Sequence, residues 1–409
     1  MRRVTTLRGL VPVMMLAASV WGGPAPAVAV GSGSGGGGGH GHGHEHGHDY
    51  VYEHAHGADY DEGHDRGNGG GGGGGGNGGG SGGGGGERPE VACGDVAGLI
   101  SAINAANSTG VGVIQLAPNC VYTLTGPTAP PGANGPDGLP VITGNVTLIG
   151  ANTTITRGSA TAFRIAEIAP GGTLTLNGIT VSGGSATTAG AGINGGGILD
   201  AGTLRLTSSV VTGNLASNVG GGIEVANNAV LDLNSSQVTH NTAGDGGGIH
   251  INSGGSLSAT SSQISDNTAS GAGGGISSFG NVTLTSVDVR RNHALNFEGG
   301  GITTNGGNFT MISGSLDGNT SGSHGGGIAN FGSQLMMQSV TVTNNTAGQN
   351  GGGLYNDSGN AQLIGDQVTG NTAGVQGGGI FVNGGTVTLT GTFVSANTPD
   401  NCVPGLAGC

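Results

Sequence analysis

The histidines of this chain gather in one stretch near the N-terminus. Eight of the twelve lie between residues 40 and 64, with carboxylates among them. They are His40, His42, His44, His46, His48, His54, His56 and His64. Neutral imidazoles beside carboxylates suit Zn²⁺, Cu²⁺ or Ni²⁺, but this spacing is not that of a closed structural zinc site. We therefore expect adaptable metal binding at several positions. The alternatives are a solvated linker and a charge switch, since imidazoles protonate below about pH 6.5.

A second group of charged residues lies far along the chain. Asp288 and Arg290 flank Val289, so both would point outward from a strand, and Asp317 would lie near Arg290 on the next repeat. Two carboxylates facing one groove are the minimum for glycoside hydrolysis. Asp288, Arg290 and Asp317 are therefore the catalytic candidates. The alternative, which we prefer, is a ladder of surface ion pairs.

These side chains are positioned by a repeat of about 26 residues, which indicates a stacked solenoid. Gly-Gly-Gly followed by Ile or Leu begins at Gly195, Gly220, Gly246, Gly273, Gly299, Gly325, Gly351 and Gly377. Each repeat also has an aliphatic residue three positions before an asparagine, as in Val289 and Asn292. The segments between these markers alternate with period two and are rich in Val, Thr and Ile, which is typical of strands.

Strands this short cannot bury an apolar face alone, so the repeats must stack around one core. We predict an all-β fold, a single-stranded parallel β-helix of about ten coils. Parallel crossovers favour the right hand. Glycine provides positive φ at the turns, and a column of asparagines can hydrogen-bond along the stack.

The paired GGGI and VxxN marks resemble the repeats of polymorphic outer-membrane proteins. Residues 90–409 as a whole resemble secreted right-handed β-helix proteins of the pectin-lyase-like class. This resemblance implies a β-helix fold and admits polysaccharide lyases and hydrolases. The family has Phe where this chain has Val, Ile or Leu, and we expect no membrane barrel after the repeats.

The chain divides into six predicted segments. They are a signal peptide at 1–29, a disordered His/Gly-rich tail at 30–86, a helical cap at 87–126, a loop at 127–140, the β-helix at 141–402 and a C-terminal cap at 403–409. The helical cap would cover the apolar end of the stack. We expect Cys93 to pair with Cys120 and Cys402 with Cys409, because each pair is close in sequence and export favours oxidation.

Several residues fall in shared columns of the repeat. Glu224 and His250 are neighbours on adjacent coils, as are Tyr355 and Phe381. Each pair could touch a ligand, but we interpret both as routine stacked pairs. Asp366 falls in a column that should point inward, and we interpret this as a local drift of register.

Composition restricts the function. The chain contains no lysine and has a net charge of −13, so we expect no binding to nucleic acid or to anionic membranes. We expect an exported surface or extracellular protein with no transmembrane segment when mature. Its first predicted function is a non-catalytic adhesion or binding scaffold for cell-surface or matrix glycans or proteins, with no required cofactor. The alternatives are a polysaccharide lyase or hydrolase and an extracellular metal-chelating protein.

Overall fold

The computed structural model describes residues 90–128, 134–187 and 193–409. The predicted signal peptide, the tail with its eight histidines, and part of the loop at 127–140 lie outside the described residues. The chain divides into residues 1–80 and 81–409, and the fold below belongs to the second unit.

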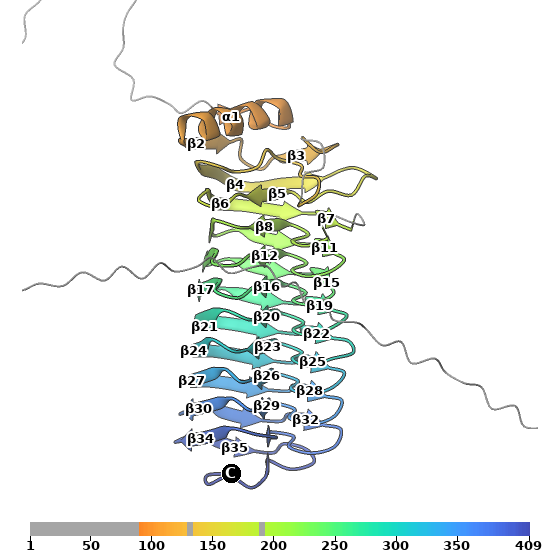
Figure 1. Cartoon of the computed structure of the whole chain (residues 1–409), viewed down its shortest axis with the longest axis vertical. Coiled ribbons are helices and arrows are strands. Elements are labelled where there is room, and N and C mark those ends of the chain that lie inside the picture. Colours follow the sequence, from red (N-terminus) through yellow and green to blue (C-terminus); the bar gives the residue numbers. More distant parts are fainter. Residues whose placement is uncertain (1–89, 129–133, 188–192) are drawn as a thin grey trace, which may run out of the picture. The chain divides into compact units, whose positions relative to one another are not determined.

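The described residues form a right-handed parallel β-helix with one helix, α1 (Val96–Thr109) (Figure 1). Three parallel sheets run along the rod. The largest, which we call the long sheet, contains β1 (Glu90–Val91), β2 (Val111–Leu116), β3 (Val121–Leu124), β4 (Asn145–Arg157), β6 (Thr173–Ser182), β9 (Thr203–Thr207), β10 (Val210–Thr212), β13 (Val230–Asn234), β14 (Gln237–Thr239), β17 (Ser256–Thr260), β18 (Gln263–Ser265), β21 (Asn281–Arg290), β24 (Asn308–Asp317), β27 (Gln334–Thr343), β30 (Asn360–Ile364), β31 (Gln367–Thr369), β34 (Thr386–Thr390) and β35 (Phe393–Ser395).

Two narrower sheets complete each coil. The Ile sheet contains β5 (Ala166–Ile168), β8 (Ile198–Asp200), β12 (Ile223–Val225), β16 (Ile249–Ile251), β20 (Ile276–Ser278), β23 (Ile302–Asn305), β26 (Ile328–Phe331), β29 (Leu354–Asp357), β33 (Ile380–Val382) and β36 (Cys402–Val403). The short sheet contains β7 (Ser185–Ala186), β11 (Leu215–Ala216), β15 (Thr242–Ala243), β19 (Thr268–Ala269), β22 (His293–Ala294), β25 (Thr320–Ser321), β28 (Thr346–Ala347) and β32 (Thr372–Ala373).

The predicted fold class is confirmed, although the rod has about twelve turns and not ten. The difference arises at the N-terminal end, where β2 and β3 already form a turn that pairs in register with β4. Both segments fall in the predicted cap at 87–126, and this turn lacks the glycine triplet of the later coils.

The core consists of ladders of apolar side chains that repeat from coil to coil. Ile223 pairs with Ile249, and Ile249 pairs with Ile276, and all three are fully buried. The two apolar columns of the long sheet are buried in the same way, as at Leu284 and Val289. Each coil therefore buries its apolar face only against its neighbours.

A column of buried asparagines closes the turn after the long sheet. Asn292 donates from Nδ2 to Oδ1 of Asn319 at 3.0 Å and to the carbonyl of Ile264 at 2.9 Å, and its own Oδ1 accepts from Asn267. The same bonds recur from Asn214 to Asn397. Because each amide satisfies its neighbours, these side chains can be buried at little cost.

Local interactions and disulfides stabilise the two ends of the stack. Asp95 caps α1 by accepting from the backbone N–H of Gly98 at 2.8 Å, and Leu99 and Ile103 are buried beneath the helix. The structure contains both expected disulfides, which are Cys93–Cys120, with Cα atoms 5.5 Å apart, and Cys402–Cys409, with Cα atoms 6.1 Å apart.

The interpretation of Asp366 as a register drift is wrong. The strand that follows it keeps its register, with Gln367 opposite Thr341, and Asp366 is only 1% exposed. Its Oδ1 accepts from the backbone N–H of Val340 at 2.7 Å. The side chain therefore stays in the inward column because that amide gives it a partner.

Candidate functional site

The predicted catalytic residues lie together on the outside of the long sheet. Arg290 is opposite Asp317 in the register, and Asp288 and Arg290 line a hollow of about 410 Å³ whose other walls are serine and glutamine side chains. Asp288 accepts from the Ser315 hydroxyl at 2.6 Å. Within the described part of the chain, Arg290 forms no ion pair with either carboxylate. A catalytic role for these residues stays a prediction.

In place of the expected ladder, one surface ion pair lies at the turn that directly follows these residues. Arg291 donates from Nε and Nη2 to the two oxygens of Asp266, each at 2.8 Å. These bonds lower the pKa of Asp266 below its ordinary value. Because the Arg291 side chain is half-exposed, the pair contributes little to the stability of the fold.

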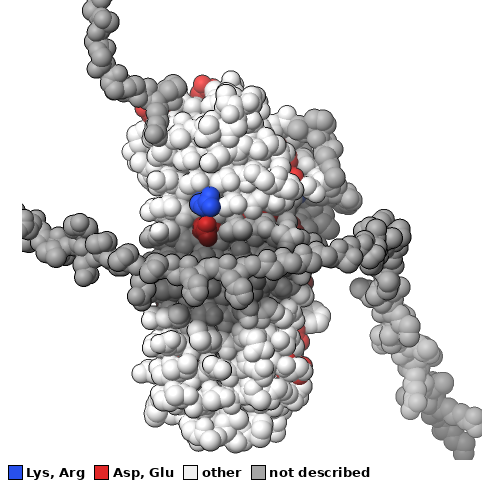
Figure 2. All heavy atoms as spheres, turned by 60° about the vertical axis from the view of Figure 1, so that its left-hand side comes forward, with Lys and Arg blue, Asp and Glu red and all other residues white. Residues whose placement is uncertain are grey.

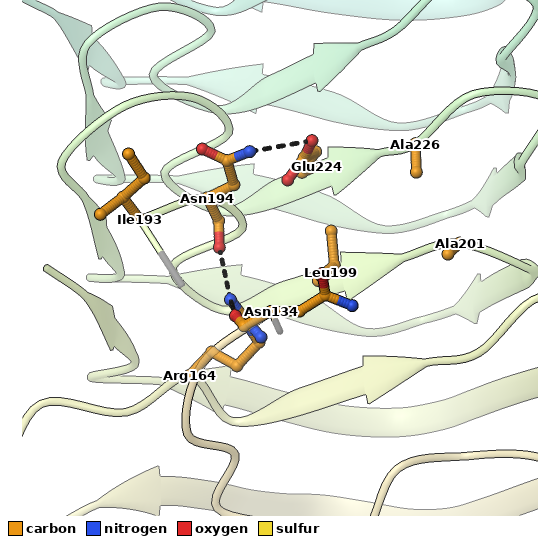
Figure 3. A pocket seen from close by; sticks show the side chains of 8 residues that line it. All are labelled: Asn134, Arg164, Ile193, Asn194, Leu199, Ala201, Glu224 and Ala226. Carbon is orange, nitrogen blue, oxygen red and sulfur yellow. Dashed lines mark hydrogen bonds between the residues drawn. The ribbon is translucent and has the colours of Figure 1, made fainter. Parts of the chain in front are cut away.

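A different site forms where the repeat is interrupted. Residues 187–197 join β7 to β8, whereas the corresponding link between β11 and β12 is only residues 217–222. A pocket of about 240 Å³ opens beside this insertion (Figure 3). Its walls are Asn134, Arg164, Ile193, Asn194, Leu199, Ala201, Glu224 and Ala226, and we call it the Arg164–Glu224 pocket.

Arg164 is the positive charge of this pocket, and it is only 1% exposed. Its Nη1 donates to Oδ1 of Asp137 at 3.1 Å and to Oε2 of Glu167 at 3.0 Å. Its Nη2 donates to the carbonyls of Asn194, at 3.2 Å, and of Asn134, whereas its Nε has no partner. Burial raises the pKa of Asp137 to about 7, although Arg164 acts in the opposite direction.

Glu224 is the second charged wall of the pocket. It points outward from β12 yet is only 5% exposed. Its Oε1 accepts from the amides of Asn252 at 2.9 Å and Asn194 at 3.3 Å, while its Oε2 is buried without a partner. Burial raises the pKa of Glu224. Asn194 thus bridges the two charged residues, since its carbonyl accepts from Arg164 (Figure 3).

His250 follows Glu224 on the next coil, as the sequence predicts, and the two are paired in register. Its Nδ1 is also buried without a partner, and burial lowers the pKa of the imidazole. The ring of Phe279 lies 5.8 Å from that of His250. Burial therefore favours the neutral forms of Glu224 and His250, compared with the same side chains in water.

The predicted pair of Tyr355 and Phe381 belongs to a larger aromatic stack. The two rings are parallel with centroids 5.7 Å apart, and the ring of His324 stacks on Tyr355 at 4.4 Å. Phe331 leans against Tyr355 at 5.8 Å. Because Tyr355 is only 6% exposed, its ring offers no free platform for a sugar. Sequence reasoning missed His324 and Phe331, which lie outside the Tyr355 column.

The outer surface of the long sheet has a character that sequence reasoning also missed. In each coil, part of the long sheet aligns with residues 203–207. We call the outward positions of these aligned segments the neutral face; they belong to β4, β6, β9, β13, β17, β21, β24, β27, β30 and β34. Most are Thr, Ser, Asn or Gln. Among these outward positions only Arg205 and Asp232 are charged, and they pair at 3.3 Å. Figure 2 shows one basic and one acidic side chain side by side near the middle of this face, with the other visible acidic atoms at its edges.

The alternation of apolar and polar residues along the strands already indicates the neutral face. Ser256, Ser258 and Thr260 of β17 are followed by Asn281, Thr283 and Thr285 on the next coil, and then by Asn308 and Thr310. Some of these side chains hold one another. Thr386, for example, donates to Oδ1 of Asn360 at 2.7 Å. The same alternation that predicts the strands therefore also places neutral polar side chains toward the solvent.

Comparison with known proteins finds no matching family, no similar curated protein and no similar solved structure. The two disulfides are consistent with an oxidising environment. No helix in the described ranges is long and apolar enough to cross a bilayer. In those same ranges no group of three or more His, Cys, Asp or Glu side chains is placed to hold a metal ion, and the eight clustered histidines lie outside them.

Proposed function

We propose that this chain is an exported, non-catalytic scaffold that attaches to neutral glycans of a cell surface or matrix. The observation that carries this proposal is the neutral face, which extends from β4 to β34 on a rod whose other charged groups are mostly acidic. Export is supported by the signal-like N-terminus and by the two disulfides.

The physical basis is a repeated set of weak polar contacts. A neutral polysaccharide presents hydroxyl groups along its length, and hydroxyl and amide side chains can both donate to and accept from them. Many weak contacts on one rigid rod add to a useful affinity, because the first contact raises the effective concentration for the next. Anionic polymers would instead be repelled by the net charge of −13.

Co-sedimentation of the full chain with insoluble cellulose and chitin tests this proposal. The double variant Thr283→Glu/Thr310→Glu places two charges on neighbouring coils of the neutral face. The matched control, Thr346→Glu/Thr372→Glu, places the same charges on neighbouring coils of the short sheet. We expect the control to sediment like the wild type and the face variant to remain in solution. Equal behaviour of the two variants would refute the assignment of the face.

The hollow beside Asp288 and Arg290 keeps a polysaccharide lyase or hydrolase as a second candidate. The discriminating variant is Arg290→Ala. If the hollow is catalytic, the wild type should release new reducing ends or unsaturated products from a polysaccharide panel, and this variant should release almost none. If the rod only binds, neither protein should release them, with or without Ca²⁺.

We also propose that the histidine tail binds Zn²⁺, Cu²⁺ or Ni²⁺, on the evidence of its eight imidazoles among carboxylates. Calorimetric titration of the full chain should show several sites of weak affinity. A variant with all eight histidines replaced by asparagine should lose them. Uptake that persists in that variant would place the metal elsewhere.

A further inference from the structure

We infer that the Arg164–Glu224 pocket is a binding site for a small organic cation that carries a primary ammonium group. This inference is independent of the proposed glycan attachment, because the pocket and the neutral face use different residues. It rests on the charge balance of the pocket, on an unpartnered buried oxygen and on the nature of the remaining walls.

The charge balance leaves one position for a cation. Arg164 is the only cationic side chain among the described residues that line or support the pocket, and it already serves both Asp137 and Glu167. Glu224 is a third carboxyl group, and its hydrogen-bond partners are the neutral amides of Asn252 and Asn194. His250 is the next group in the column, and Asp245 is the acidic residue that influences it. A ligand with a positive charge would balance Glu224.

The unpartnered oxygen shows where the cation would bind. Both amide donors reach Oε1 of Glu224, so Oε2 is left without a partner in a side chain that lines the pocket. An unpaired polar atom buried in this way is costly unless a ligand or water satisfies it. An ammonium group supplies both the hydrogen-bond donor and the opposite charge.

The other walls define the size and character of the ligand. Ile193, Leu199, Ala201 and Ala226 provide apolar contact for a short carbon chain. The volume of about 240 Å³ is below the range of roughly 300–1,000 Å³ that holds drug-sized ligands. An anion would meet the carboxyl of Glu224 and an Arg164 already paired with Asp137 and Glu167, and a neutral alcohol would leave an ionised Glu224 uncompensated.

Binding of a cation should displace a proton from Glu224. Because its pKa is raised, the Glu224 carboxyl holds its proton more tightly in the pocket than it would in water. An ammonium group favours the ionised form, so affinity should rise with pH through that pKa. The heat of binding should then depend on the ionisation enthalpy of the buffer, which a merely structural pocket would not show.

The test is a titration of the full chain with three matched probes, butylamine, butanol and butyrate, followed by NMR and calorimetry. We expect butylamine to bind at least tenfold more tightly than butanol, with butyrate not binding. Glu224→Gln keeps the shape of the side chain and should reduce the butylamine affinity at least tenfold. Glu298→Gln, at a glutamate that does not line the pocket, is the control and should bind like the wild type.

Two results would overturn the inference. Equal affinity for butylamine and butanol would show that the pocket selects no charge, and absence of butylamine binding would show that it is structural. Both comparisons use the wild type, so they hold even if Glu224→Gln folds poorly. The proposed function is tested separately, since Thr283→Glu/Thr310→Glu should bind butylamine normally and Glu224→Gln should still sediment with cellulose.

Discussion

Asp366 shows how one residue can depart from its ladder. The same inward column holds Ser236 and Ser262, and Oγ of Ser262 both accepts from the backbone N–H of Ser236 and donates to a carbonyl two residues before it. Asp366 makes the first bond, to Val340, but its Oδ2 has no partner. Burial therefore raises its pKa from 3.8 to about 6.

Replacement of this residue by serine should change how stability depends on pH. Because the folded state holds the proton more tightly, the carboxyl stabilises the fold below about pH 4, and that contribution is lost as the pH rises through 6. Asp366→Ser should therefore gain roughly 1–2 kcal/mol relative to the wild type between pH 4 and pH 8. Urea unfolding at several pH values measures this difference.

The control for this prediction is Asp232→Ser, which removes a carboxylate from the surface pair with Arg205. Its difference from the wild type should stay nearly constant over the same pH range, because exposed pairs contribute little. A constant difference for Asp366→Ser as well would mean that the buried carboxyl does not titrate near pH 6.

The glycine triplets define the corner between the short sheet and the Ile sheet. A Cβ on Gly300 would lie 2.4 Å from the carbonyl carbon of Thr320 and 2.5 Å from the carbonyl oxygen of Gly326. Both are backbone atoms, so they cannot rotate away. The first glycine of the same triplet, Gly299, has a φ of +67°. The corner therefore needs glycine both for close approach and for its backbone conformation.

Gly300→Ala should destabilise the rod by roughly 3 kcal/mol or more, as overpacking against fixed atoms does. Gly405→Ala is the matched control, because a Cβ there would meet nothing within 4 Å. Thermal unfolding followed by circular dichroism compares the two. Similar melting temperatures for both variants would show that the coils can separate at the corner.

The repeating elements were predictable from the sequence, and the interruptions were not. Period two and the fixed offset from Leu284 to Val289 place the strands and their inward columns, because every coil meets the same neighbours. The first turn falls in the predicted cap because β2 and β3 carry neither marker. The pocket was missed because Arg164 lies outside the strict repeats, so no period predicts its burial against Asp137.

At the scale of the whole molecule, each coil contacts mainly the coil before it and the coil after it. Stability should then be close to a sum over coils and their interfaces, as in other solenoids. The coil from Gly299 to His324 ends immediately before the next triplet, at Gly325, and contributes one strand to each sheet. Its neighbours on both sides carry the same ladders.

Deletion of residues 299–324 should therefore give a folded rod that is shorter by about 4.8 Å, the spacing of paired strands. Asn292 would then meet Asn345, and the asparagine column would stay continuous. Small-angle scattering measures the length of the rod, and circular dichroism measures its strand content. Deletion of residues 299–311, about half a coil, is the control and should unfold the protein because it breaks the register. A stable half-coil deletion would contradict the nearest-neighbour account.

The central claim is that the rod binds a neutral glycan without cleaving it. The most direct measurement is a single incubation of the full chain with insoluble cellulose and chitin, in which both the protein in the pellet and the reducing ends in the supernatant are measured. We predict that the protein sediments and that no new reducing ends appear. Protein that stays in solution with both polymers, or the release of soluble products, would contradict the claim.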